Sequence, residues 1–353
     1  MTKQSPITPA ALSSRAQVSA PYDMVAEQFC AFAQQIGLQA EDSDEGVSIR
    51  FRLGQINLSG TAVQTQVELT SESASSLQLL RDLVAERMTE AGLTPEWSTK
   101  AVSSQPANMS MTTVVEVRPL TPSYTRVVIE GPDLARFDEG GFHFRLLFGP
   151  EGAGWPYLDN AGITQWPGGS KAWHRPVYTT RSIETQPDGL TRIAFDVFLH
   201  DGGRVTEWCR SLTVGTQMAV TGPGGGRGAV PAAWVCLIGD ETAVPVIARM
   251  LKDLPETTKG AAVLFVPDAG DIQDLPHPRD VQIEWKLRGG DATPLGSLQD
   301  AILPNQDRFV FFAAERKEVI AARGYLIDNG LDKGEFQCAA YWTDEDMEKR
   351  DER

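Results

Sequence analysis

The feature that most constrains the fold is a change of pattern near residue 231. Before it, six runs that alternate apolar and polar residues follow one another without a long helical stretch, which is typical of antiparallel strands. From Trp234 onward, five short apolar runs alternate with helical stretches near 241–252, 295–302 and 316–328. Strands that alternate with helices predict a parallel sheet covered by helices. The sequence therefore predicts an antiparallel β-barrel over residues 108–230 and an α/β parallel-sheet, nucleotide-binding-like domain over residues 231–353.

The region before the barrel has a different character. Residues 1–20 are rich in Ser, Thr, Ala and Gln without periodicity, which predicts a disordered leader. Residues 20–98 contain two stretches of helical periodicity that flank alternating runs within 46–69, and these patterns predict a small α+β accessory domain. This domain shows no recognisable catalytic set, and residues 100–110 form its linker to the barrel.

Charge and cysteine content exclude several classes of protein. The chain has 32 Lys and Arg against 47 Asp and Glu, for a formal net charge of -15, which disfavours binding to nucleic acid. Its 4 cysteines form no CxxC pair, so we expect neither a metal site nor a disulfide framework. No run approaches the ~18 apolar residues of a membrane helix, and the polar start lacks a signal-peptide core. We therefore expect a cytoplasmic protein without membrane insertion.

The most informative motif is RPVYTTR at residues 175–181. It resembles the R-x-Y-[ST] signature of ferredoxin-reductase-like flavoproteins, in which Arg pairs with the FAD pyrophosphate, Tyr packs on the flavin and the hydroxyl approaches N5. The resemblance assigns these last two roles to Tyr178 and Thr179. Arg175 lies three residues before Tyr178 instead of two, so Arg181 is an alternative partner for the pyrophosphate. A barrel strand with two surface arginines is the competing interpretation.

A second segment, DVFLHDGGRVTEWCRSL, predicts a strand, a glycine turn at Gly202–Gly203 and a short helix. The first N–H groups of such a helix can receive a diphosphate, and the Thr206 hydroxyl can add a hydrogen bond. The spacing of Leu199, His200, Gly203 and Trp208 resembles a second FAD-contact region of the siderophore-interacting reductases. We expect His200 to be a cofactor contact and not an acid or base.

Four further segments match that family in the same order, namely 143–148, 220–226, 237–251 and 339–342. The chain is thus similar to the siderophore-interacting protein family from residue 108 to its end. Trp342 is similar to a C-terminal aromatic residue near the flavin, and a core tryptophan is the competing interpretation. The resemblance implies an FAD-dependent ferric-siderophore reductase that releases Fe(II) and has no catalytic acid or base. The residues expected to contact FAD are Arg175, Tyr178, Thr179, Thr180, Arg181, His200, Gly202, Gly203, Val205, Thr206 and Trp342.

The expected nucleotide turn, GDETAVP, has acidic residues where a Rossmann protein has a glycine-rich loop. Asp240 and Glu241 would repel a diphosphate, although Asp240 could equally be a helix N-cap. We therefore expect NAD(P)H to bind in a non-standard way near Asp240, Glu241, Thr242 and Ala243. Ferredoxin is the alternative electron donor.

The substrate would be a ferric siderophore, and basic residues beside the flavin would attract an anionic chelate. Arg145 and Arg227 stand where relatives often have basic residues. Thr343 stands where relatives often have Arg, so a neutral hydroxamate chelate is as plausible as a catecholate. Two alternative functions remain open: a flavin reductase that passes electrons from NAD(P)H to a partner protein, and a siderophore-binding protein without turnover.

Overall fold

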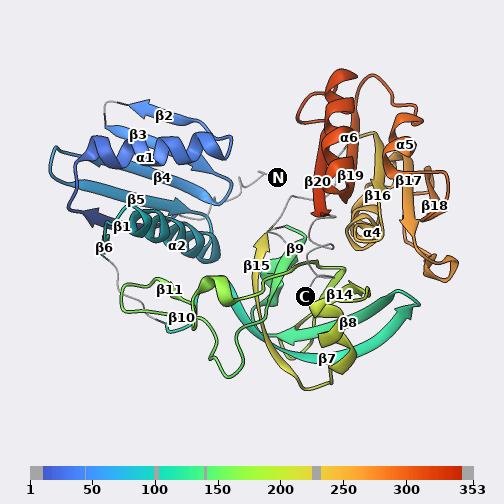
Figure 1. Cartoon of the computed structure of the whole chain (residues 1–353), viewed down its shortest axis with the longest axis horizontal. Helices are drawn as coiled ribbons and strands as arrows, with labels where there is room; N and C mark the ends of the chain where they lie inside the picture. The colour runs from blue at the N-terminus through green and yellow to red at the C-terminus, as the bar shows by residue number, and fades with distance from the viewer. Residues whose placement is uncertain (1–10, 44, 99–102, 139–140, 225–231, 344–353) are drawn as a thin grey trace, which may run out of the picture. The chain divides into compact units, whose positions relative to one another are not determined.

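The computed structural model describes residues 11–43, 45–98, 103–138, 141–224 and 232–343 (Figure 1). The chain divides into two compact units. The first consists of Met1–Met109 with Leu147–Arg175, and the second consists of Ser110–Leu146 with Pro176–Arg353. Among the described residues, no helix combines the length and the apolar composition needed to cross a membrane.

The first unit contains a six-stranded antiparallel sheet with two helices packed on one face. The strand order is β2-β3-β4-β5-β1-β6. Ile56 and Leu69 of the sheet share one apolar core with Phe29 and Val84 of the helices. Its elements are β1 (Leu12–Val18), α1 (Tyr22–Gln35), β2 (Ala40–Ser43), β3 (Gly46–Phe51), β4 (Gly54–Gly60), β5 (Thr65–Ser71), α2 (Ala74–Glu90) and β6 (Glu96–Trp97).

Strand β1 corrects the expectation of a disordered leader over residues 1–20. Residues Leu12–Val18 pair with β5 along their whole length, and alternate residues Ser14, Ala16 and Val18 are buried. Ser14 and Ala16 are small and only weakly apolar or polar. The alternation of buried and exposed residues in this strand is therefore hard to recognise in the sequence. Residues 1–10 lie outside the described residues.

The first unit also contains residues 147–175, which connect two strands of the barrel. This segment has little secondary structure of its own. It contains a short hairpin of β10 (Tyr157–Leu158) and β11 (Thr164–Gln165), followed by the 3-10 helix η2 (Ser170–Ala172). The sequence placed this segment within the barrel domain of 108–230, because strand patterns do not reveal which core a connection joins.

The second unit begins with a seven-stranded barrel-like sheet in the order β12-β9-β15-β7-β8-β14-β13. Apolar and polar residues alternate along these strands because one face of each strand packs inward. In this core, Phe144 lies between Phe137 and Phe195. Its elements are β7 (Met109–Thr121), β8 (Tyr124–Gly131), η1 (Leu134–Asp138), β9 (His143–Leu147), β12 (Val177–Thr179), β13 (Ser182–Thr185), β14 (Thr191–Phe198), α3 (Arg204–Ser211) and β15 (Gln217–Gly224). The predicted antiparallel barrel is confirmed.

The predicted parallel-sheet domain is also confirmed, with strand order β18-β17-β16-β19-β20. Alternate residues of β16 enter two different cores: Leu237 packs with α4, whereas Ile238 packs with α6. The strand is buried on both faces, which explains its continuous apolar run. The elements are β16 (Trp234–Gly239), α4 (Val244–Asp253), β17 (Lys259–Val266), η3 (Ala269–Asp271), β18 (Val281–Leu287), α5 (Pro294–Gln299), β19 (Arg308–Glu315), α6 (Arg316–Asp328) and β20 (Phe336–Trp342).

Buried polar contacts join the barrel to the parallel-sheet domain within the second unit. The Tyr124 hydroxyl donates to the carbonyl of Glu241 at 2.6 Å. The buried Asp271 of the parallel-sheet domain accepts hydrogen bonds from the Thr121 hydroxyl (2.7 Å) and the Ser123 N–H (2.8 Å) of the barrel. The turn after β16 is therefore fixed against the barrel.

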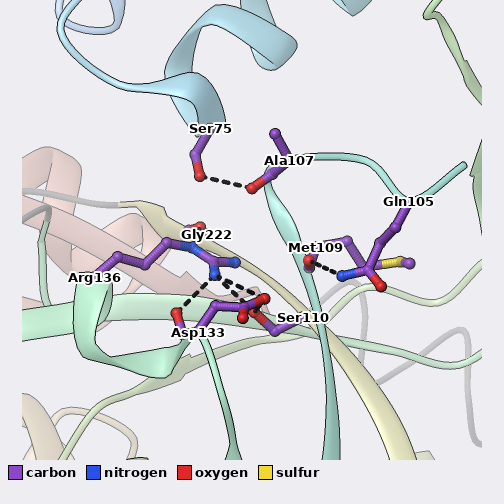
Figure 2. A network of polar contacts seen from close by, with 8 residues as sticks. All are labelled: Ser75, Gln105, Ala107, Met109, Ser110, Asp133, Arg136 and Gly222. Carbon is purple, nitrogen blue, oxygen red and sulfur yellow. Dashed lines mark hydrogen bonds and ion pairs between the residues drawn. The ribbon is translucent and has the colours of Figure 1, made fainter. Parts of the chain in front are cut away.

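The end of β15 is held by Arg136 of η1 (Figure 2). Its guanidinium donates to the carbonyl of Gly222 (3.0 Å), to the Ser110 hydroxyl (2.7 Å) and to the carbonyl of Asp133 (2.8 Å). A Cβ at Gly222 would lie 2.9 Å from the Phe137 ring, so this close approach requires glycine. Residues 225–231, which follow β15, lie outside the described residues.

Candidate functional site

The centre of the RPVYTTR motif forms β12, a strand of the barrel that pairs antiparallel with β9. Tyr178 lies opposite Phe144, and its ring packs 5.3 Å from the Phe195 ring. Burial raises the pKa of Tyr178, so its phenol stays protonated. The aromatic core of the barrel thus fixes the ring that the sequence assigns to the flavin.

Thr179 lies opposite His143, a residue that the sequence analysis did not select. The Thr179 hydroxyl is 3.3 Å from His143 Nδ1, and the Tyr341 hydroxyl is 3.4 Å from His143 Nε2. The imidazole therefore joins the hydroxyl proposed for flavin N5 to a phenol of the parallel-sheet domain. The position of His143 at the start of HFRLLF could have suggested it, but its partner Tyr341 lies 198 residues away.

The two residues that follow Thr179 are directed into the protein. Thr180 is fully buried, and its carbonyl accepts a hydrogen bond from Arg249 (3.4 Å). Arg181 is 11% exposed and lies 3.4 Å from Asp196, which also accepts two hydrogen bonds from Arg126. Burial lowers the pKa of Arg181. Two guanidiniums thus share one carboxylate, so this group of three residues carries one excess positive charge.

Arg175 belongs to the first unit and is exposed. Its guanidinium lies 4.8 Å from the centroid of the Trp166 ring, within the connecting segment. Pro176 and Val177 join it to Tyr178. The two arginine candidates therefore differ, because Arg175 is presented by the connection whereas Arg181 is an internal ion-pair partner.

The second predicted FAD contact is a tight turn between β14 and α3. Gly202 has a φ of 70°, and a Cβ at Gly203 would lie 2.7 Å from the His200 ring and 2.9 Å from the Thr206 hydroxyl. That hydroxyl accepts a hydrogen bond from the His200 N–H (3.1 Å). The His200 ring packs on Phe198 with an interplanar angle of 24°. Val205 and Thr206 are buried in the first turn of α3, where helix geometry leaves N–H groups unsatisfied.

This turn fits the diphosphate of a dinucleotide. A Cβ at position 203 would displace the His200 ring or the Thr206 hydroxyl, and the absence of a side chain lets a ligand approach the backbone closely. The flavin candidates Tyr178 and Thr179 and the turn belong to the same unit and the same sheet. The site residues are therefore compatible with FAD.

At the expected nucleotide turn, Asp240 is not a helix N-cap, since α4 begins after Ala243. Its carboxylate instead accepts hydrogen bonds from the Thr242 N–H (2.9 Å) and hydroxyl (2.5 Å), and from the Trp342 indole (2.7 Å). Burial raises the pKa of Asp240. These contacts explain why an acid stands here: it closes the turn and holds the last residue of β20.

Glu241 is buried and paired with Arg288, which follows β18. The Arg288 guanidinium also lies 5.3 Å from the centroid of the Trp342 ring. Burial raises the pKa of Glu241, and the Arg288 charge opposes that effect. The repulsion that we expected between Glu241 and a diphosphate is therefore reduced by an ion pair that the sequence did not reveal.

A cavity of about 370 Å³ opens at the carboxyl ends of the parallel strands. Arg288, Lys317 and Trp342 line it, together with the Gly289–Gly290 turn and Glu318. Ligands of doubly wound sheets bind at this edge. The sequence analysis missed Arg288 and Lys317, although the RGG triplet directly after an apolar strand was a usable signal.

The remaining candidate site residues are Trp342, Arg145 and Arg227, and they lie in different places. Trp342 was expected beside the flavin, but it lines the parallel-sheet cavity, and its neighbour Tyr341 is the residue that reaches the barrel. Arg145 is exposed on β9 opposite Val177. Arg227 lies outside the described residues.

A barrel with a tyrosine–threonine strand and a glycine turn, followed by a five-stranded parallel sheet, defines the class of ferredoxin-reductase-like flavoproteins. The model of the siderophore-interacting FAD-binding domain matches residues 113–227, and the siderophore-interacting protein model matches residues 232–345. The chain belongs to the siderophore-interacting protein family.

Individual proteins agree with this assignment. The chain is 31% identical over 235 residues to the ferric vibriobactin reductase ViuB of Vibrio cholerae, covering 62% of this chain and 83% of that protein. It is 28% identical over 239 residues to the NADPH-dependent ferric-chelate reductase of Escherichia coli, covering 65% and 91%. The crystal structure of a siderophore utilization protein from T. fusca aligns with a TM-score of 0.59 at 27% identity, covering 69% and 96%.

Proposed function

We propose that the chain is an FAD-dependent oxidoreductase that reduces ferric siderophores and releases the iron as Fe(II). The observation that carries this proposal is that one sheet contains both the Tyr178–Thr179 strand and β14, the strand that leads into the Gly203 turn, inside the region that matches an FAD-binding domain. The reductase names of the relatives from Vibrio cholerae and Escherichia coli support the same reaction.

Several residues would hold the cofactor. The Tyr178 ring would pack on the isoalloxazine, and the first turn of α3 with Gly203 and Thr206 would bind the diphosphate. The excess positive charge of the Arg126–Asp196–Arg181 group would favour an anionic cofactor. When bound, FAD links a two-electron donor to a one-electron acceptor.

Thr179 and His143 would handle a proton. The Thr179 hydroxyl can donate to or accept from His143 Nδ1, and Nε2 faces the Tyr341 phenol. An imidazole is suited to this role because its ordinary pKa is close to neutrality. We assign His143 as the group that would receive, through the Thr179 hydroxyl, the proton that the flavin loses when it gives up its electrons to the ferric chelate.

NAD(P)H is the donor that we propose, bound at the cavity lined by Arg288 and Lys317. The Lys317 ammonium and the Arg288 guanidinium, which is paired with Glu241, would bind phosphate groups beside the lining carboxylates Glu315 and Glu318, and the Trp342 ring offers an aromatic surface. Asp240, Thr242 and Ala243 would shape the adjoining turn. Ferredoxin remains the alternative donor, and a cytoplasmic location stays a prediction.

The substrate is a ferric chelate. Its hard oxygen ligands favour Fe(III) over Fe(II), so reduction weakens the complex and promotes release. Arg145, exposed on β9, would attract an anionic chelate, and we propose the same role for Arg227.

Anaerobic reoxidation tests the function directly. Apoprotein is loaded with FAD, reduced with NADPH, NADH or reduced ferredoxin in parallel, and mixed with a ferric trihydroxamate or a ferric tris-catecholate. We expect the flavin absorption to return while a ferrous chelator reports Fe(II). A flavin that stays reduced with every chelate would refute the proposal.

A further inference from the structure

Two adjacent acidic residues, Asp240 and Glu241, stand in the turn after β16, where a nucleotide-binding turn usually has glycines. Both residues are buried. A buried carboxylate destabilises a protein unless its partners compensate for the lost hydration. The role of this acidic turn therefore depends on the partners that its two carboxylates hold.

These partners are two residues that line the cavity at the carboxyl edge of the parallel sheet. Asp240 accepts a hydrogen bond from the Trp342 indole (2.7 Å), and Glu241 pairs with the Arg288 guanidinium. The guanidinium lies 5.3 Å from the centroid of the Trp342 ring, and both side chains line the cavity. The contacts among the four side chains thus form a closed ring, in which each acid of the turn holds one cavity residue.

The backbone of the acidic turn is itself fixed on two sides. The Asp240 N–H donates to the carbonyl of Ala313 in β19 (3.2 Å). The Tyr124 hydroxyl of the barrel donates to the carbonyl of Glu241 (2.6 Å). The Glu241 carboxylate is therefore attached to a rigid base, and the ion pair extends this rigidity to the Arg288 side chain.

Arg288 lies at the margin of the parallel sheet. It follows the last residue of β18, which is an edge strand, and it precedes the glycine pair Gly289–Gly290. A long arginine side chain loses rotamer entropy when it binds a ligand, and contacts that hold it beforehand reduce this loss. The carboxylate of Glu241 and the ring of Trp342 are such contacts.

The ion pair leaves the guanidinium able to bind a second anion. A guanidinium carries several N–H donors in a planar fork, and the contact with Glu241 engages one terminal nitrogen. The Glu241 side chain is 6% exposed, whereas the Arg288 side chain is 39% exposed and lines the cavity. One cation can therefore contact a buried acid and an anion in the cavity at the same time.

The other acids around the cavity increase the need for a fixed cation. Glu315 and Glu318 also line the cavity, and their charges oppose the binding of a phosphate. A cation that is held in one position offsets this repulsion better than one that samples several rotamers. In addition, Glu241 Oε2 is buried without a hydrogen-bond partner among the described residues, which is uncommon for a group kept only for stability.

We propose that Glu241 is a positioning residue that holds the Arg288 guanidinium against the Trp342 ring and thereby prepares it to bind a phosphate group of the nucleotide donor. The acidic turn thus acts through an arginine, whereas a glycine-rich turn acts through its own N–H groups. This inference rests on the proposed function, because it takes NAD(P)H as the electron donor. The phosphate group is either the 2′-phosphate of NADPH or the diphosphate that NADPH and NADH share.

Calorimetric titration of the full-length, FAD-loaded protein with NADP⁺ and NAD⁺ tests this role. Glu241→Ala and Glu241→Gln both remove the carboxylate charge, but only the Gln side chain keeps an oxygen that can accept from Arg288. Their difference therefore isolates the contact from the charge. We expect the Kd for NADP⁺ to be about tenfold higher in Glu241→Ala than in Glu241→Gln. The same ratio for NAD⁺ would assign Arg288 to the diphosphate, and a ratio of about one would assign it to the 2′-phosphate.

Further variants separate positioning from general damage. In an Arg288→Ala background, the two Glu241 variants should bind NADP⁺ equally within about twofold, because no guanidinium is left to position. The Kd for FAD should stay at the wild-type value in both Glu241 variants. Glu256→Ala, which changes an exposed acid between α4 and β17, is the control and should leave every Kd unchanged.

Glu241→Asp takes the place of Glu241→Ala if that variant does not fold. It keeps the negative charge but is one methylene shorter, so it should lose the contact with Arg288. The Kd for NADP⁺ should then rise about tenfold above that of the wild type.

Equal Kd values for NADP⁺ in Glu241→Ala and Glu241→Gln would overturn the proposal, as would a tenfold ratio that persists without Arg288 or an unchanged Kd in Glu241→Asp. Wild-type protein that binds neither nucleotide would overturn it too, while the reoxidation assay with reduced ferredoxin would still decide the reductase function. Protein that takes up no FAD would instead refute the proposed function, and titration of that apoprotein would still show whether Glu241 positions Arg288.

Discussion

The barrel and the parallel-sheet domain build their candidate sites in opposite ways. In the barrel, Tyr178, Thr179 and the Gly203 turn are short contiguous motifs held by strand pairing and one helix start. In the parallel-sheet domain, Asp240, Arg288 and Trp342 come from the ends of three strands and become a site only through mutual contacts. A contiguous motif can be recognised in a sequence, whereas a site assembled across strands is visible only in the fold.

The largest expected effect tests the barrel side of this comparison. Gly203→Val places a branched side chain against the His200 ring and the Thr206 hydroxyl, so the Kd for FAD should rise by about two orders of magnitude. Fluorescence titration of the apoprotein measures it. Gly324→Ala, at a helix position with open space, is the control and should leave FAD binding unchanged. Normal FAD affinity in Gly203→Val would remove the turn from the site.

A second variant tests whether the assembled site binds the donor. Arg288→Ala should raise the KM for NADPH about thirtyfold, the effect of losing one charge-assisted phosphate contact, and leave chelate-driven reoxidation of prereduced protein unchanged. Steady-state and stopped-flow assays separate these steps. Arg279→Ala, an exposed arginine of the same domain, is the control. An equal loss in both steps would place Arg288 outside donor binding.

His143 lies between Thr179 of the barrel and Tyr341 of the parallel-sheet domain, and His143→Phe tests its role in proton transfer. The variant keeps an aromatic ring but loses both nitrogens, so the chelate-driven reoxidation of reduced flavin, which releases a proton, should slow about tenfold while the Kd for FAD stays close to that of the wild type. Stopped-flow traces over a pH series provide the measurement. If the proton passes elsewhere, the pH profile of the variant will match that of the wild type.

The smallest expected effect concerns stability. Trp342→Phe removes the indole donor to Asp240 and should lower the free energy of unfolding by about 1–2 kcal/mol. Burial raises the pKa of Asp240 in the folded protein, whereas the indole hydrogen bond favours the ionised carboxylate and opposes that rise, so the variant raises this pKa further and loses more stability than the wild type as the pH rises. The deficit of the variant should therefore grow from acidic to neutral pH in urea titrations. A deficit that is independent of pH would show that Asp240 is not involved.

The sequence predicted most strands and the change of fold near residue 231, because the apolar period is strong where a strand packs on a core. It failed at β1, where small side chains hide that period. It selected Thr179 but not His143, because the register that places them opposite one another is set by the pairing of β9 with β12, two strands that are distant in the sequence. It could not assign the connecting segment to the N-terminal domain, since Asp82 and Thr164 are 82 positions apart and neither belongs to a motif.

The Arg126–Asp196–Arg181 group has a consequence for measurements in concentrated salt. Dissolved ions screen exposed charges strongly and withdrawn charges weakly. Asp196 is 2% exposed and Arg181 is 11% exposed, whereas Arg145 faces solvent. Rising ionic strength should therefore weaken the binding of anionic chelates at lower salt concentrations than those that weaken the binding of FAD.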